Sequence, residues 1–180
     1  MESRQIKFGD LRIGPLARRK IAEALDRNWV TEGPNVREFE EKFASKFGWR
    51  HAIMTSSGSM AATGVWAAIR EITAAGWMKR SVITPACAFV STVNSLLAAG
   101  LWPEFVDIEL ETLNLDLSLA VREIPHGRNG DPLGIQYVAQ MGSPVGVDAA
   151  REIAEQHNLY LVGDWCEAIG AKLNGEYAEH

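Results

Sequence analysis

The feature that most constrains the fold is the alternation of short apolar runs with helix-length amphipathic segments. The runs are apolar on successive residues, as in SVITP at 81–85 and LYLVGD at 159–164. Such strands are buried on both faces, and strands joined through helices run parallel. We therefore expect an α/β fold with a mainly parallel sheet between two helical layers. The five expected strands are 51–55, 81–85, 103–108, 134–140 and 159–163.

Apolar residues at helical spacing predict the helices between these strands. They cover segments around 17–25, 36–47, 59–75, 88–99 and 147–157. Gly48, Gly76 and Gly100 follow three of them and are expected to end them. The expected buried face of the 59–75 helix consists of Ala61, Val65, Ala68, Ile69 and Ile72. The polar stretch 125–132 predicts a flexible loop.

Composition and charge exclude several classes of protein. The chain is 47% hydrophobic and 23% charged, as expected of a globular protein. Its net charge of -5 argues against nucleic-acid binding, and no apolar run has the length of a membrane span. The N-terminal MESRQIKFGD lacks the apolar region of a secretory signal. Two cysteines and four histidines show no metal-ligand spacing, so we expect no metal site and a cytoplasmic location.

Polar and small residues gather where the expected strands end. Ligands of parallel sheets bind beyond the carboxyl ends of the strands. The segments at that edge are Thr55–Ser59, Pro85–Phe89, Gln140–Gly142 and Asp164. We expect these four segments to converge on one cleft.

The TSSGS segment at 55–59 lies between an expected strand and a helix start. Free backbone N–H groups and the positive end of the helix dipole suit a phosphate there. Ordinary N-capping by serine is the alternative explanation. The dinucleotide pattern GxGxxG and the phosphate-loop pattern GxxxxGK[ST] are both absent, which disfavours NAD and ATP.

Phe89 and Asp164 suggest recognition of a flat heteroaromatic ring. Phe89 is expected near the start of its helix, where it either fills the core or stacks on a ligand. Asp164 follows an apolar run and either caps a helix or meets a ligand. An ionised aspartate beside a pyridine nitrogen keeps that nitrogen protonated, which pyridoxal phosphate (PLP) needs to act as an electron sink.

The order of these segments resembles the DegT/StrS-type sugar aminotransferases. NWVTEGPNVREFEEKFASKFGWRHAIMTSSGSMA is similar to the family's opening, with a W-[LV]-T-x-G-P segment, an acidic helix, a strand and an S-S-G-[ST] turn. VITPACAFVSTVNSLLAAGLWPEFVDIELETLNLD is similar to the next block. VAQMGSPVGVDAAREIAEQHNLYLVGDWCEAIGA is similar to the block that ends in E-D-x-x-Q-A-x-G.

The resemblance implies the aspartate-aminotransferase-type fold (fold type I), a homodimer, and amino transfer from a donor such as glutamate to a keto-sugar nucleotide. It places Ser57, Gly58 and Ser59 at the PLP phosphate, Phe89 against the ring and Asp164 on the pyridine nitrogen. Glu167 is expected near the cofactor's phenolic oxygen or phosphate, and Trp29 and Thr31 are expected to bind substrate.

Two departures from the family pattern leave alternatives open. Glu167 replaces the usual glutamine and Ile169 the usual histidine, which is closer to PLP-dependent sugar 3-dehydrases. Those relatives deoxygenate their substrate and use histidine where transaminases have lysine. None of the six lysines aligns with the family's cofactor-binding lysine. A non-catalytic remnant or interaction module is therefore the alternative from another class.

The resemblance also suggests how the chain is divided. Residues 1–50 are expected to form an N-terminal helical segment, and 51–180 a partial PLP-binding large domain that lacks the lysine segment and the C-terminal small domain. In the family's fold, later strands join the 51–55 strand to the sheet. We therefore expect 51–55 to lie apart from the other four strands, 159–163 to form a sheet edge, and the chain to bind PLP weakly.

The lysine argument leads to a direct chemical test. After borohydride reduction of the chain with PLP, peptide mapping is expected to show no dominant labelled lysine. Lys172 is the sharpest case, because it follows the Asp164 segment but aligns with a variable surface position. Stoichiometric labelling of Lys172 would contradict the expectation.

Overall fold

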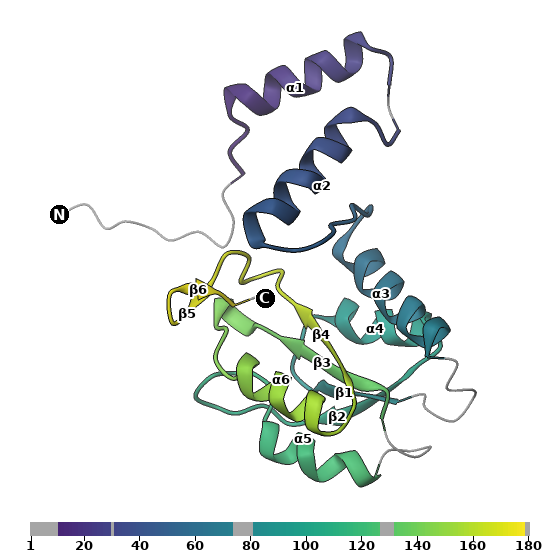
Figure 1. The fold of residues 1–180 in the computed structure, drawn as a ribbon, viewed down its shortest axis with the longest axis vertical. Coiled ribbons are helices and arrows are strands. Elements are labelled where there is room, and N and C mark those ends of the chain that lie inside the picture. Colours follow the sequence, from purple (N-terminus) through teal and green to yellow (C-terminus); the bar gives the residue numbers. More distant parts are fainter. Residues whose placement is uncertain (1–10, 30, 74–80, 127–131, 179–180) are drawn as a thin grey trace, which may run out of the picture.

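The computed structural model describes residues 11–29, 31–73, 81–126 and 132–178. Two helices, α1 and α2, precede an α/β layer structure in which helices and parallel strands alternate (Figure 1). The helices are α1 (Pro15–Asp26), α2 (Pro34–Phe47), α3 (Gly58–Ile72), α4 (Val90–Ala98), α5 (Leu117–Glu123) and α6 (Val147–Gln156). The strands are β1 (Ser81–Pro85), β2 (Trp102–Val106), β3 (Gly134–Val138), β4 (Tyr160–Asp164), β5 (Lys172–Leu173) and β6 (Glu176–Tyr177).

Four strands form one parallel sheet in the order β2-β1-β3-β4. Helices α3 and α4 cover one face and α5 and α6 the other, with α3 and α4 to the right of the sheet in Figure 1. Within β1 the side chains alternate, so that Val82 packs toward α3 and α4 while Ile83 packs toward α5 and α6. The expected parallel α/β fold is confirmed.

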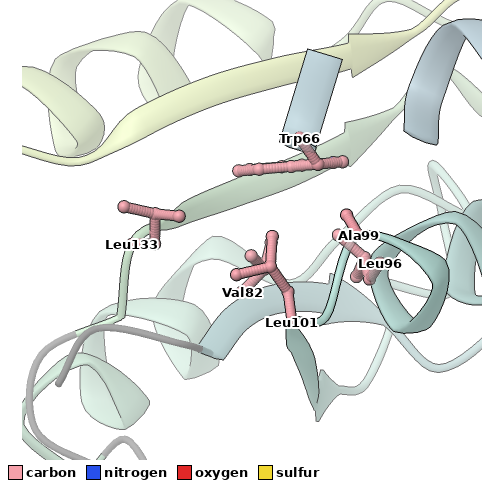
Figure 2. Packing of buried hydrophobic residues seen from close by; sticks show 6 residues of the cluster. All are labelled: Trp66, Val82, Leu96, Ala99, Leu101 and Leu133. Carbon is pink, nitrogen blue, oxygen red and sulfur yellow. The ribbon is translucent and has the colours of Figure 1, made fainter. Parts of the chain in front are cut away.

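Trp66 of α3 is the centre of the core between α3, α4 and the sheet (Figure 2). Its side chain is completely buried, and Nε1 donates a hydrogen bond of 2.5 Å to Oε1 of Gln136 on β3. Gly134 admits the ring, because a Cβ there would lie 2.9 Å from Trp66 and would collide with the Tyr160 carbonyl oxygen. The buried cluster comprises Trp66, Val82, Leu96, Ala99, Leu101 and Leu133.

The predicted buried face of α3 is largely wrong. Val65 and Ile72 are 43% and 71% exposed, whereas Trp66 is buried and Ile69 packs half-buried beside it. A period of 3.6 does not distinguish two apolar stripes on one helix, and the larger ring takes the face toward the sheet. The apolar face of α1 is likewise exposed, with no buried residue.

The prediction of a strand at 51–55 is also wrong, because the segment has no regular secondary structure. Its backbone is tied to α2, where Met54 N donates to Glu40 Oε1 over 2.7 Å, and Ile53 is 83% exposed. The segment does lie outside the four-stranded sheet, and β4 is an edge strand of that sheet, both as expected. A strand needs a neighbouring strand for its hydrogen bonds, and the described residues supply none to 51–55.

Smaller differences concern the ends of elements and short structures. Helix α2 ends at Gly48 in the left-handed conformation (φ 72°) as predicted, whereas Gly76 lies outside the described residues. Pro125 and His126 belong to a 3₁₀ turn, and 127–131 of the predicted loop are outside the description. The sequence interpretation missed α5, which Asp116 caps by accepting from the Ser118 and Leu119 amides, and the β5–β6 hairpin. Each helix in the described part of the chain is too short or too polar to cross a membrane.

Replacement of Trp66 is expected to destabilise the fold severely. Trp66→Ala removes the largest fully buried side chain among the residues that the structure describes and is expected to cost about 3–5 kcal/mol in the free energy of unfolding. Trp66→Phe keeps most of the ring but leaves the Gln136 oxygen without its donor, which is expected to cost about 1–3 kcal/mol. Urea denaturation followed by circular dichroism measures both; equal stability of Trp66→Ala and the unsubstituted chain would contradict this role.

Candidate functional site

A cleft of about 530 Å³ lies at the carboxyl ends of the strands, between the first turns of α3 and α4. The segments after β1, β3 and β4 and the start of α3 converge on it, as the sequence predicted. The lining residues are Gly58, Ser59, Ala62, Cys87, Ala88, Phe89, Ser91, Thr92, Val138, Ala139, Gln140, Asp164, Cys166 and Glu167.

The first turn of α3 forms one wall of the cleft. Ser57 is the N-cap, and its Oγ accepts from the Met60 amide over 3.3 Å. Thr55 Oγ1 donates to the Ser57 carbonyl oxygen over 2.8 Å and fixes the turn before the helix. Gly58 and Ser59 line the cleft, and amides at the start of a helix have no acceptor within the helix. Ser57 therefore caps the helix, and the first turn of α3 also has amides that are suited to bind an anion.

Phe89 lies at the N-cap of α4, with its side chain 73% exposed and lining the cleft. The alternative of a core aromatic is therefore wrong. An exposed ring on a cleft wall is available to stack on a flat ligand, a contact that contributes about 0.5–1.5 kcal/mol for an aromatic pair.

Asp164 ends β4 and presents a half-buried carboxylate to the same cleft. Its Oδ2 accepts from Thr92 Oγ1 over 3.0 Å, and its Oδ1 accepts from the Cys166 amide over 3.1 Å. The bond from the Cys166 amide is local, within the turn after β4, and the bond from Thr92 joins β4 to α4. The carboxylate therefore has a defined orientation through the protein's own contacts.

Glu167 fastens the turn that follows β3. Its Oε2 accepts from the Met141 amide over 2.7 Å, and Met141 has the left-handed backbone conformation (φ 53°). The sequence interpretation considered Glu167 only as a charge near the cofactor and missed this bond. This hydrogen bond gives Glu167 a structural role, because it holds the backbone of the turn at Met141.

Asn114 holds the other side of the same turn. It is buried, its Oδ1 accepts from the Gln140 amide over 3.0 Å, and its Nδ2 donates to the carbonyl oxygens of Ser143 and Val145. The Tyr137 hydroxyl also donates to the Val145 oxygen, over 2.8 Å. The sequence interpretation overlooked Asn114, for which the only signal was an amide in the TLNLD segment.

Both free cysteines of the chain line the cleft. A hydrogen bond to Asp164, burial and the negative charges of Asp164 and Glu167 raise the pKa of the Cys166 thiol to about 11. Cys166 is therefore a weak nucleophile at neutral pH. Among the residues that the structure describes, neither a lysine nor a histidine lines this cleft.

Trp29 and Thr31, the predicted substrate-binding residues, do not line the cleft that contains Asp164. Trp29 contributes to a second cleft of about 520 Å³ between α1 and α2, together with Arg27, Glu32, Gly33, Pro34 and Arg37. Its Nε1 donates to the Glu32 carbonyl oxygen over 2.7 Å, and the ring lies on Gly33, where a Cβ would be 2.8 Å away. The role of Trp29 and Thr31 in substrate binding stays a prediction.

A parallel sheet with a helix start, an exposed aromatic ring and a carboxylate at one edge is consistent with the fold of PLP-dependent transferases of fold type I, to which comparison with known proteins assigns the chain. The sequence model of the DegT/DnrJ/EryC1/StrS aminotransferase family matches residues 12–178. The chain belongs to this family.

Individual relatives agree with this assignment. The chain is 36% identical to a GDP-4-keto-6-deoxy-D-mannose 3-dehydratase of Yersinia pseudotuberculosis, over 88% of this chain and 39% of that protein. It is 29% identical to a GDP-perosamine synthase of Vibrio cholerae, over 88% of this chain and 41% of that protein. The E. coli GDP-4-keto-6-deoxy-D-mannose-3-dehydratase with bound hydrated PLP superposes with a TM-score of 0.73 at 28% identity, over 95% and 42% of the two chains. The chain thus spans less than half the length of these relatives.

The contact between Asp164 and Cys166 predicts how a substitution changes thiol reactivity. Asp164→Asn weakens the hydrogen bond and removes the charge by which Asp164 raises the pKa of the Cys166 thiol, so the thiol is expected to ionise at lower pH. Each unit of decrease in pKa raises the thiolate fraction about tenfold at pH values below both pKa values. Iodoacetamide alkylation of Cys166 in a Cys87→Ser background, measured over a pH series, tests this. An unchanged pH midpoint would show that Asp164 does not control the thiol.

Proposed function

We propose that this chain carries the cofactor cleft of a PLP-dependent enzyme that modifies keto-sugar nucleotides by amino transfer. The observation that carries the proposal is that the α3 start, Phe89 and Asp164 line one cleft. These are an anion site, a stacking surface and an acceptor for a protonated ring nitrogen, which match the phosphate, face and nitrogen of PLP.

Each residue has a defined task in this proposal. The α3 start, with Ser57, Gly58 and Ser59, binds the phosphate, Phe89 stacks on the ring, and Asp164 holds the proton on the ring nitrogen. Glu167 orients the Met141 turn at the cleft wall. When bound, PLP supplies the electron sink for the bond changes at the substrate's amino carbon.

The names of the relatives support the substrate class in this proposal. A GDP-4-keto-6-deoxy-D-mannose 3-dehydratase and a GDP-perosamine synthase are both named for nucleotide-linked sugars, which supports a keto-sugar nucleotide with an amino donor. The proposal includes a homodimer, with substrate contacts from Trp29 and Thr31, and residues 51–180 as part of a PLP-binding large domain. The two free thiols are compatible with a reducing, cytoplasmic location.

A 3-dehydratase is the second candidate function. The dehydratase of Y. pseudotuberculosis is 36% identical to this chain, against 29% for the perosamine synthase. Glu167 and Ile169 also depart from the transaminase pattern in the direction of the dehydratases. The identity of the downstream residue, lysine or histidine, distinguishes the two reactions.

Cofactor binding tests the proposal directly. Titration of the chain with PLP, followed by tryptophan fluorescence, is expected to show weak but saturable binding. Phe89→Ala is expected to weaken PLP binding by about twofold to tenfold, since stacking contributes about 0.5–1.5 kcal/mol.

Phe105→Ala is the matched control for this titration. Phe105 is 56% exposed on β2 and does not line the cleft, so its removal is expected to leave the affinity unchanged. Equal effects of the two substitutions, or no saturable binding to the unsubstituted chain, would contradict the proposed site.

A further inference from the structure

We propose that Thr92 is the positioning residue of this site, which holds the Asp164 carboxylate in the orientation that meets the cofactor's ring nitrogen. Thr92 lies in the first turn of α4 and is 2% exposed. Its Oγ1 donates to Asp164 Oδ2 over 3.0 Å. The inference rests on the proposed function where it concerns the ring nitrogen.

The backbone of Thr92 is fixed independently of Asp164. Its amide donates to the Phe89 carbonyl oxygen over 2.9 Å, and its own carbonyl oxygen accepts from Ser95 Oγ over 2.8 Å. Ser95 is itself buried. One turn of α4 therefore carries the ring-stacking residue and the donor to the carboxylate, held together by hydrogen bonds.

The bond from Thr92 leaves the carboxylate able to bind a ligand. A carboxylate offers about four lone-pair sites on its two oxygens. Thr92, the Cys166 amide and the Cys166 thiol use three of these sites, so one remains for a ligand.

The chemical consequence is the orientation of one hydrogen bond. A protonated ring nitrogen donates to the carboxylate only when the remaining lone-pair site faces it. The Thr92 hydroxyl fixes that orientation, and a methyl group in its place does not. Thr92 therefore acts on the ring through Asp164, without contact with the reacting atoms.

The first experiment uses the chain without cofactor. Thr92→Val replaces the hydroxyl by a methyl group of similar size, and Thr92→Ser keeps the hydroxyl as the matched control. In a Cys87→Ser background, Cys166 alkylation is followed over a pH series, because the thiol senses the position of Asp164. Thr92→Val is expected to move the midpoint to lower pH, toward that of Asp164→Asn, whereas Thr92→Ser leaves it in place.

This readout separates positioning from a general loosening of the site. Greater access to Cys166 would raise the alkylation rate at every pH by the same factor and leave the midpoint unchanged. An unchanged midpoint in Thr92→Val overturns the inference, whether or not the chain binds PLP.

The second experiment compares PLP with its 1-deaza analogue, in which CH replaces the ring nitrogen. Thr92→Val is expected to weaken the binding of PLP severalfold and to leave the binding of the analogue unchanged. The effect on PLP is expected to vanish in an Asp164→Asn background. Equal loss for both ligands overturns the inference. Failure of the unsubstituted chain to bind PLP refutes the proposed function instead, and the thiol experiment then decides the inference alone.

Discussion

The packing of Trp66 on the sheet is the interaction on which the rest of the structure depends. Its ring fills the space above Gly134, and its hydrogen bond to Gln136 fixes α3 along β3. The start of α3 is thereby held beside the carboxyl end of β4, where a Cβ on Gly58 would lie 3.4 Å from Cys166 Sγ. A core contact made by a tryptophan thus sets the distance between the turn at the start of α3 and the loop after Asp164.

The cleft is built from polar contacts between segments distant in sequence. Thr92 joins α4 to β4, Glu167 joins the loop after β4 to the turn at Met141, and Asn114 joins the opposite side of that turn to the segment before α5. Each contact involves a side chain whose partner lies at least 20 residues away. The orientation of the site is therefore a property of the assembled sheet.

The sequence interpretation succeeded where a residue's environment follows from its own segment. Continuously apolar runs predicted β1, β3 and β4, and their parallel order placed Phe89 and Asp164 at one edge. It failed where the structure of a segment depends on contacts with a segment that is distant in sequence. HAIMT at 51–55 has a strand's composition, yet it forms no strand because the described residues provide no neighbour for it.

By itself, the sequence determined the parallel α/β class and the segments that meet at the cleft, because apolar runs and helical periods are local properties of the chain, and the order of its motifs indicated the family. Only the tertiary structure decided that Phe89 is exposed, that Trp66 takes the buried face of α3, and that Thr92, Glu167 and Asn114 orient the site. Burial and hydrogen bonding depend on which side chains meet across elements, and a residue's own neighbours in sequence do not contain that information.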